Sequence, residues 1–288
     1  MNRLTLRLKS SVRGHVSLRG AVPDRWLELT LAEIAAWPIE VDRRPATIEQ
    51  VFDVSDGSRS RWLLQGDLKQ CEFVGAGMRS GDIVVESSVG YYAASFMRGG
   101  CVVVQGDAGA YAASSLRAGK VTIEGNVGPY AAAAAPNQSR GMAGGELIIQ
   151  GNADQWLASR MRRGLVVVHG DVASGCATRM IAGTLAICGR VAMPIGCGMA
   201  RGTLLLLEPQ ESYLNEGLLG FTPPSLCQLS FLPLLLQQLT PYLPAGLANE
   251  IRDSRWRRCL GDRAELGLGE VLLRQATEHP PSARLNPS

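Results

Sequence analysis

The residues of this chain that could perform acid–base chemistry are carboxylates in its central part. The candidates are Asp82, Asp107, Asp154 and Asp171. Cleavage of a sugar chain requires an acid and a base that converge on one face of a fold. No single sequence column concentrates these carboxylates, no nucleophile has a neighbouring histidine, and no glycine loop has the pattern that binds phosphate. The sequence therefore predicts no catalytic residue on this chain.

Metal chemistry finds equally little support in the sequence. The chain has seven cysteines without a Cys-x-x-Cys pair, and its three histidines, His15, His169 and His279, are far apart. Zinc sites use closely spaced ligands. We therefore predict no metal site and no cofactor on this chain. An odd number of cysteines in a sequence without an export signal indicates reduced, mostly buried thiols.

A 19-residue repeat occupies the centre of the chain and has the form Met-x-x-Gly-x-φ-x-φ-x-Gly, where φ is aliphatic. Its units start at Met78, Met97, Leu116, Met142, Met161, Met180 and Met199, and one unit contains an insertion at 136–141. Aliphatic residues two positions apart indicate a strand. One short strand per unit can bury its apolar face only by stacking on its neighbours.

The repeat predicts an all-β fold, namely a parallel β-helix of about seven to eight 19-residue coils, which we take to be right-handed. Strands would stack about 4.8 Å apart, and glycine at both ends of each strand would supply the positive φ values and the close backbone approach that tight corners require. We expect a small α/β amino-terminal cap at 1–56, in which Thr30-Leu-Ala-Glu33 opens a short helix. The β-helix would occupy 57–208, starting with an irregular coil at Trp62 to Gly66, and 209–288 would be a helical or extended wrapping segment.

The residue between each aliphatic pair should point outward, because the pair itself faces the interior. That column contains Val84, Val103, Thr122, Ile148, Val167, Ala186 and Leu205. An exterior aliphatic stripe is typical of a partner surface, although β-propensity on a solvated face would select similar residues. We predict a partner interface that consists of Val84, Val103, Thr122, Ile148, Val167 and Leu205.

Two other columns are regular enough to suggest a role. Aromatic residues recur as Tyr92, Tyr111, Tyr130 and Trp156. They would stack as a packing ladder, or alternatively form a ligand platform. Arginine follows the first residue of a unit at Arg79, Arg98, Arg117 and Arg162. This row would receive an acidic chain or an acidic subunit face, the alternative being a solvated row.

Composition and charge exclude other classes of protein. The net charge is +3, and the basic residues are scattered rather than interleaved with aromatic residues, so we expect no nucleic-acid partner. The richest apolar stretch, Leu226 to Leu239, contains Pro233 and is shorter than the roughly 20 residues that span a bilayer. The amino terminus lacks a signal-peptide core. We expect a cytoplasmic protein without membrane contact.

A resemblance to a known family is carried by the repeat segments MRSGDIVVE, MRGGCVVVQGDAGAYAAS, MAGGELIIQGNAD, MRRGLVVVHGDV and MIAGTLAICG. These segments resemble the C subunit of formylmethanofuran dehydrogenase and of its bacterial counterpart, the formyltransferase/hydrolase complex. The segments GDLKQCEFVGAGM and WRRCLGDRAELGLGEVLL extend the resemblance over nearly the whole chain. A similar coil occurs in the carboxyl-terminal domain of the large glutamate synthase subunit, but the freestanding length favours the first family.

The resemblance implies a multisubunit enzyme of tetrahydromethanopterin-dependent one-carbon metabolism, which handles formyl groups on a methanofuran-type carrier. This chain would be a non-catalytic scaffold that docks hydrolase-like, formyltransferase-like and, in dehydrogenase forms, molybdopterin-enzyme-like subunits. The carrier and the metals would be held by those partners. The arginine row would face another subunit or the polyglutamate-like tail of such a carrier; it consists of Arg79, Arg98, Arg117 and Arg162. The alternatives are an interaction domain of the glutamate synthase type and a stand-alone β-helical enzyme acting on polysaccharides. The composition, rich in arginine and alanine, favours a bacterial hydrolase complex.

Overall fold

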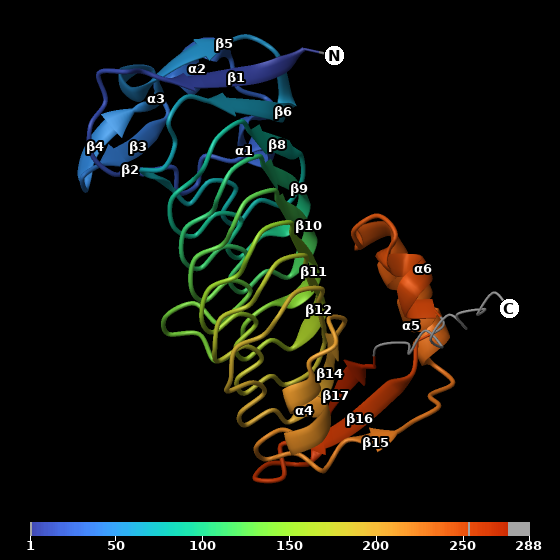
Figure 1. The fold of residues 1–288 in the computed structure, drawn as a ribbon. Coiled ribbons are helices and arrows are strands. Elements are labelled where there is room, and N and C mark those ends of the chain that lie inside the picture. Colours follow the sequence, from blue (N-terminus) through green and yellow to red (C-terminus); the bar gives the residue numbers. More distant parts are fainter. Residues whose placement is uncertain (1, 253, 276–288) are drawn as a thin grey trace, which may run out of the picture.

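The computed structural model describes residues 2–252 and 254–275, and in them strands predominate over short helices (Figure 1). The amino-terminal segment contains β1 (Arg3–Leu8), β2 (Val16–Ser17), α1 (Pro23–Trp26), α2 (Leu31–Ala35), β3 (Pro38–Val41), β4 (Arg44–Thr47), α3 (Ile48–Val51) and β5 (Phe52–Ser55). The central segment contains β6 (Ser58–Gln65), β7 (Cys71–Glu72), β8 (Asp82–Val85), β9 (Arg98–Val104), β10 (Ala118–Ile123), β11 (Ala143–Ile149), β12 (Arg163–Val168), β13 (Thr184–Ile187) and β14 (Arg201–Leu206). The carboxyl-terminal segment contains α4 (Glu211–Glu216), β15 (Ser225–Leu226), α5 (Leu232–Leu239), the 3-10 helix η1 (Thr240–Tyr242), α6 (Leu247–Arg252), β16 (Trp256–Gly261) and β17 (Leu268–Arg274).

One large, mostly parallel sheet runs the length of the molecule. Its strand order is β15-β16-β17-β14-β13-β12-β11-β10-β9-β8-β6-β1-β5. Neighbours from β6 to β14 pair in parallel; for example, Val102 of β9 lies opposite Val121 of β10. A second parallel contact of one residue per unit links Val89, Ala108, Val127, Ala153, Val172 and Val191. Each unit therefore meets the next at two separate places.

Contact between neighbouring units explains the Met-x-x-Gly element of the repeat. Gly119 has a φ of +97°, and a Cβ there would lie 2.5 Å from Met97 Cε and 2.7 Å from Gly100 O. The buried methionine of one unit thus fills the space that a side chain at the glycine of the next unit would occupy. Glycine is required at this position both for its conformation and for its lack of a side chain.

The second glycine column has a different reason. We expected both columns to provide positive φ, but Gly125 does not adopt it. A Cβ at Gly125 would lie 2.7 Å from Gly106 C and 2.3 Å from Asp107 Oδ1. The expected close approach of two backbones therefore selects glycine in this column, and only the expectation of positive φ is wrong for it.

The tight corners are made largely by residues other than glycine. Tyr92, Ala94 and Phe96 have φ values of 61°, 53° and 56°, and the equivalent residues of later units repeat this left-handed pattern. Such a conformation costs roughly 1–2 kcal/mol for an L-residue. Stacking of the aromatic rings and complete burial of Ala94 offset this cost.

The inner columns form the main core. All of the paired aliphatic residues of β8 to β14 are at most 1% exposed, from Ile83 and Val85 to Leu204 and Leu206. This confirms the assignment of the pair to the interior. Removal of these side chains from water in every unit provides the main stabilisation of the stack.

The amino-terminal segment closes one end of the stack. Strand β1 pairs in parallel with β6 and antiparallel with β5, so β6 does not present a free edge. Trp26 packs on Trp62 with ring centroids 4.2 Å apart, and Trp37 lies 5.8 Å from Trp26. The predicted capping box is confirmed, because the Thr30 hydroxyl accepts from Glu33 N–H and opens α2.

The carboxyl-terminal segment does more than wrap the stack. Strand β17 pairs in parallel with β14, with Val271 opposite Leu204, and β16 pairs antiparallel with β17. The sheet therefore continues beyond Glu208, where we expected it to stop, through a strand that returns from much later in the chain. No helix in the described part of the chain is long and apolar enough to cross a membrane.

Candidate functional surfaces

The outer face of the large sheet comprises the side chains of β8 to β14 that point away from the inner columns. Val84, Val103 and Thr122 are half-buried there, whereas Ile148 and Val167 are 5% and 0% exposed. Leu205 is also 0% exposed. The predicted stripe thus consists of an open part on β8 to β10 and a covered part on β11 to β14.

The covered part lies beneath the chain's own carboxyl-terminal segment. Its residues share a second hydrophobic core with Leu232, Leu236 and Leu239 of α5, Ile251 of α6 and Trp256 of β16. Figure 1 shows α5 and α6 beside this end of the sheet. This corrects the predicted interface at Ile148, Val167 and Leu205, because intramolecular packing already buries these side chains.

A sequence signal for this cover was present in the columns that flank the stripe. Early units place charged or polar residues there, such as Glu86 and Glu124, whereas later units have Leu165, Cys188 and Leu207. All three of the later residues belong to or pack against the second core. The flanking columns thus become more apolar where the chain covers the outer face.

Tyr242 marks the boundary between the two parts. Lys120 Nζ lies 4.9 Å from the centroid of its ring, and the Tyr242 carbonyl lies 2.7 Å from His169 Nε2. Burial, and then a hydrogen bond with Glu146, raise the pKa of the Tyr242 hydroxyl. These contacts fix η1 against β10 to β12.

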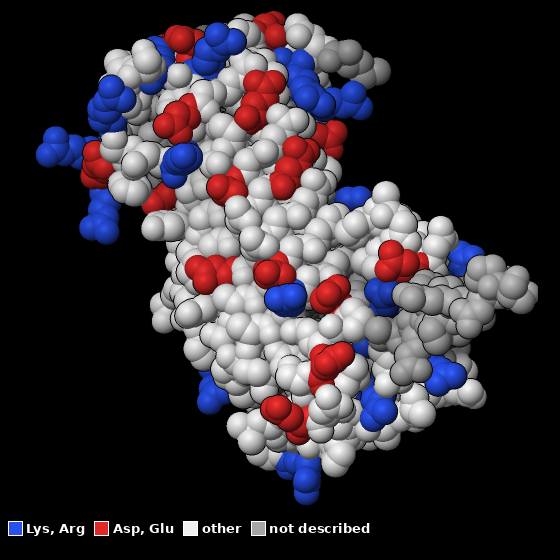
Figure 2. Space-filling view, in the orientation of Figure 1, with Lys and Arg blue, Asp and Glu red and all other residues white. Residues whose placement is uncertain are grey.

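The open part combines an aliphatic centre with polar flanks. Arg61 Nε lies 3.7 Å from Asp82 Oδ2, and Gln65 Nε2 donates to Glu86 Oε2 at 2.8 Å. Figure 2 shows acidic side chains dispersed along the visible face, with basic side chains mostly near the two ends of the molecule. An aliphatic patch rimmed by polar groups has the composition of a docking surface.

The predicted arginine row is part of a larger group, which we call the arginine corner. It comprises the arginines at the last, second and third positions of the units and in the insertion: Arg79, Arg98, Arg117, Arg140, Arg160, Arg162, Arg163, Arg179 and Arg201. All are exposed or half-exposed, and none forms an ion pair within the described residues. The insertion projects from this corner. The Ser115 hydroxyl holds its two ends, because it donates to Arg140 O and accepts from Ala135 N–H.

The aromatic column is a continuous stack. Ring centroids are 5.0 Å apart from Tyr92 to Tyr111 and from Tyr111 to Tyr130, and 6.3 Å apart from Tyr130 to Trp156. Phe73 extends the stack at the other end, 4.8 Å from Tyr92. The rings contact one another face to face, which fits the predicted packing ladder.

Two of the candidate carboxylates, together with two asparagines, form a second ladder. Asp107 Oδ1 accepts from Asn126 N–H at 2.7 Å, and Asp171 Oδ1 accepts from Arg190 N–H at 2.7 Å. Asn126 and Asn152 continue the same column between them. Asp107 and Asp171 share this column but are separated by the two asparagines, and both satisfy backbone donors of the next unit.

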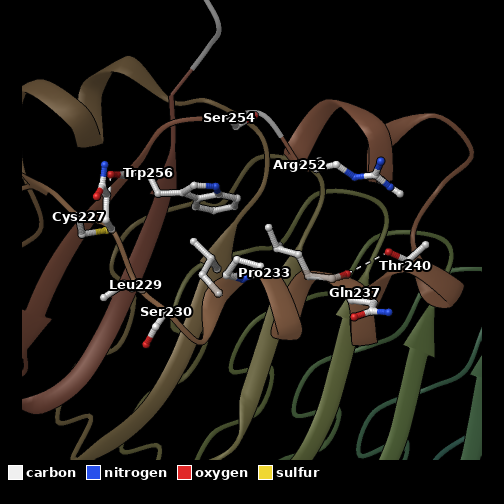
Figure 3. Close-up of a pocket in the computed structure, with 13 residues that line it drawn as sticks. Cys227, Leu229, Ser230, Pro233, Gln237, Thr240, Arg252, Ser254 and Trp256 are labelled. Carbon is white, nitrogen blue, oxygen red and sulfur yellow. Dashed lines mark hydrogen bonds between the residues drawn. The ribbon is translucent and has the colours of Figure 1, made fainter.

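A hollow of about 750 Å³ lies between α5, α6 and the loop after β15 (Figure 3). Leu232, Leu236 and Trp256 provide apolar walls, and Arg252 provides a charge at the rim. The Cys227 thiol lies at one end, where burial raises its pKa and Sγ lies 3.5 Å from Trp256 O. A thiol with a raised pKa is not an activated nucleophile.

The cysteines are free thiols, three of them buried. Burial raises the pKa of Cys71, Cys176 and Cys188 to about 12 and that of Cys259 to about 11. Among the residues described, no three histidine, cysteine, aspartate or glutamate side chains come close enough to hold a metal ion.

Comparison with known proteins places these surfaces in context. A chain of the formyltransferase/hydrolase complex (FhcABCD) from Methylorubrum extorquens, whose crystal structure contains methylofuran, matches with a TM-score of 0.85 and 34% sequence identity. The match covers 94% of this chain and 100% of that chain. The C subunit of the tungsten-containing formylmethanofuran dehydrogenase 2 of Methanococcus maripaludis is 29% identical over 94 residues, and so is its counterpart in strain DSM 14266. The aligned region is 32% of this chain and 35% of each of these relatives. No protein-family model matches the chain.

The fold and surfaces define a class of protein in which glycine-rich 19-residue units stack through parallel strands and expose regular side-chain columns. Within that class, the extent of the structural match and its sequence identity decide the family. The chain belongs to the family formed by the C subunits of formylmethanofuran dehydrogenase and of the bacterial formyltransferase/hydrolase complex.

Proposed function

We propose that this chain is the non-catalytic scaffold subunit of a formyltransferase/hydrolase complex related to formylmethanofuran dehydrogenase. The observation that carries the proposal is its match to a chain of FhcABCD at 34% identity over the full length of that chain. The complex would serve tetrahydromethanopterin-dependent one-carbon metabolism and handle formyl groups on a methanofuran-type carrier. The carrier and any metals would be bound by partner subunits, not by this chain.

The stacked units provide the physical basis of the proposed scaffold. We take them to form a parallel β-helix, because consecutive units pair in parallel at two places and bury one continuous core. We take it to be right-handed because parallel crossover connections almost always are. Such a stack is stiff and presents long surfaces of fixed spacing. Rigid surfaces reduce the entropic cost of assembling catalytic subunits at defined positions.

The open part of the outer face is our candidate for docking one catalytic subunit. Val84 and Val103 form its aliphatic centre and Thr122 continues the column, and the chain itself leaves all three half-exposed. The predicted arginine row would face a second, acidic partner. It consists of Arg79, Arg98, Arg117 and Arg162. The partners we propose are hydrolase-like and formyltransferase-like subunits, together with a molybdopterin-enzyme-like one.

Affinity purification of the chain from its own cell, tagged at its natural locus, tests the assembly. Mass spectrometry should identify hydrolase-like and formyltransferase-like subunits in stoichiometric amounts. A bound molybdenum or tungsten cofactor would assign the complex to the dehydrogenase form, and its absence from an assembled complex to the hydrolase form. Recovery of a lone chain, or of an amidotransferase or flavoprotein, would contradict the proposal.

A pair of substitutions tests the docking surface in the same purification. Val84→Asp combined with Val103→Asp should release one catalytic partner, because two charges would be desolvated at the centre of the interface. The matched control combines Ser58→Asp with Ser60→Asp, near the start of β6, where the chain pairs with β1. Equal recovery of every partner with the Val84 and Val103 variant would exclude this face as the interface.

A further inference from the structure

The arginine corner is electropositive because its positive charges lack nearby counter-charges. The corner is formed by the last two residues of each unit and the first four of the next. Between Met78 and Gly202, none of these positions contains aspartate or glutamate. The insertion adds Arg140 to this corner and no carboxylate. Arginines at this density repel one another unless an anionic partner pairs with them.

One carboxylate stands near each end of the corner, and both already bind backbone donors. Asp24 Oδ1 accepts from Arg79 N–H at 3.0 Å, and Asp262 Oδ2 accepts from Gly198 N–H at 2.9 Å. The free positive charge therefore lies between the two ends. Six steps of about 4.8 Å separate the units of Arg79 and Arg201, giving a track of roughly 29 Å.

A small pocket opens at the amino-terminal end of this track. Its volume is about 460 Å³, and Phe96, the last residue of the first unit, is one of its walls. Two more guanidinium groups flank it: Arg19 lies 4.0 Å from the centroid of Phe73, and a Cβ at Gly20 would lie 3.0 Å from Arg25 Nη1. The pocket thus combines aromatic walls with two cations that form no ion pair within the described residues.

We propose that the arginine corner and this pocket form one docking site for an extended acidic peptide segment of a partner protein. About nine extended residues, at roughly 3.3 Å each, would span the track. Their carboxylates would pair with the arginines, and an apolar residue at one end would enter the pocket beside Phe96. The inference rests on the proposed scaffold function, since it names the chemistry of one partner.

The neighbouring columns favour a peptide over a nucleic acid. Single-stranded nucleic acids bind through bases that stack on free aromatic rings. The tyrosines next to the corner stack on one another at 5.0 Å, so no base fits between them. Within the described corner, Phe96 is the aromatic residue at the surface, and it belongs to the pocket.

Fluorescence anisotropy of the purified full-length chain tests the inference directly. The probe is a labelled ten-residue peptide that alternates glutamate with serine and ends in phenylalanine. It should bind, and its affinity should fall as salt rises, because the contacts are charge pairs. The same peptide with glutamine for glutamate should not bind. An oligonucleotide of equal charge that binds as tightly as the peptide would overturn the proposal.

The triple variant Arg98→Gln, Arg117→Gln and Arg162→Gln should weaken peptide binding at least tenfold and flatten its salt dependence. The matched control replaces Arg13, Arg44 and Arg255, which are exposed elsewhere, and removes the same charge. An unchanged melting temperature excludes misfolding in both. Equal binding by the two variants would refute the site. If the triple variant no longer binds the peptide but still co-purifies with every partner, only this inference is contradicted. If the unmodified chain binds the peptide but co-purifies with no partner, the scaffold function is contradicted instead.

Discussion

The outer faces of β8–β10 and of β12–β14 are built on the same parallel register, but only the second is covered by the chain itself. Val103 and Val167 occupy equivalent positions, and one is half-exposed while the other is 0% exposed. The flanking residues differ as well, since Cys101 and Gln105 lie beside Val103, whereas Leu165 and His169 lie beside Val167. Leu165 packs against the second core. Identical backbone geometry therefore does not determine what binds to a surface; the side chains beside the stripe do.

The largest expected effect distinguishes these two equivalent valines. Val167→Asp would place an unpaired carboxylate in the second core and should cost several kcal/mol, a large share of a typical stability of about 5–15 kcal/mol. Val103→Asp, the matched control, should cost less than about 1 kcal/mol. Urea denaturation of both variants measures the difference. Similar midpoints would mean that the carboxyl-terminal segment does not cover the sheet in solution.

A smaller loss of stability should follow from shortening a buried side chain of the covering helix α5 than from placing a charge on the sheet beneath it. Leu239→Ala, at a position with 0% exposure, should destabilise the protein by about 2–4 kcal/mol through the cavity it leaves. Leu234→Ala on the same helix α5, where the side chain is 63% exposed, should change stability by no more than about 0.5 kcal/mol. Thermal unfolding of the pair tests this. If Leu234→Ala were the more harmful, α5 would present its opposite side to the sheet.

The smallest effect concerns two thiols on the outer face. Burial raises the pKa of Cys188 to about 12, and Cys101, on the open part, is less buried, with a pKa that burial also raises. Because the thiolate is the reactive form, its fraction in Cys188 should increase about tenfold per pH unit below pH 12. Iodoacetamide should therefore label Cys101 well before Cys188 at pH 8, as peptide mass spectrometry can show. Faster labelling of Cys188 would contradict the cover.

Raised thiol pKa values also make stability depend on pH. When the folded pKa of an acid exceeds its unfolded value, near 9 for a thiol, the unfolded state releases protons first as pH rises. The stability contribution of Cys176 is therefore complete below about pH 9 and is lost progressively between pH 9 and 12, at about 1.4 kcal/mol per pH unit. Replacing Cys176 with alanine should reduce this alkaline slope.

The interior of the stack could be predicted from sequence because it depends on local spacing. Aliphatic residues two apart and glycine at a fixed offset recur in every unit. The sequence alone therefore predicts that Val102 and Val121 occupy equivalent interior positions, and the structure places them opposite each other. The cap helix α2 was predictable for the same reason, since its capping box spans only Thr30 to Glu33.

The sequence predicts a wrapping segment at 209–288, but it does not predict that this segment covers the outer face of β11–β14, because that packing depends on contacts between residues far apart in sequence. Strand β17 does contain the spacing of the repeat, with Gly269, Val271 and Leu273 in the positions of a glycine and an aliphatic pair. A single unit separated by some 60 residues from the last regular one was not recognisable by period. The additional arginines were missed because the predicted row included only the second position of each unit, whereas the corner also includes the last and third positions.

Both ends of the large sheet finish with antiparallel strands, β5 beyond β1 and β16 with β15 beyond β17. A bare parallel edge would accept another stacked molecule and allow open-ended polymerisation. Termination at both ends instead gives the molecule a fixed length, set by the number of units that its gene encodes. Evolution can therefore change the distance between two attached proteins only in steps of about 4.8 Å, by gaining or losing whole units.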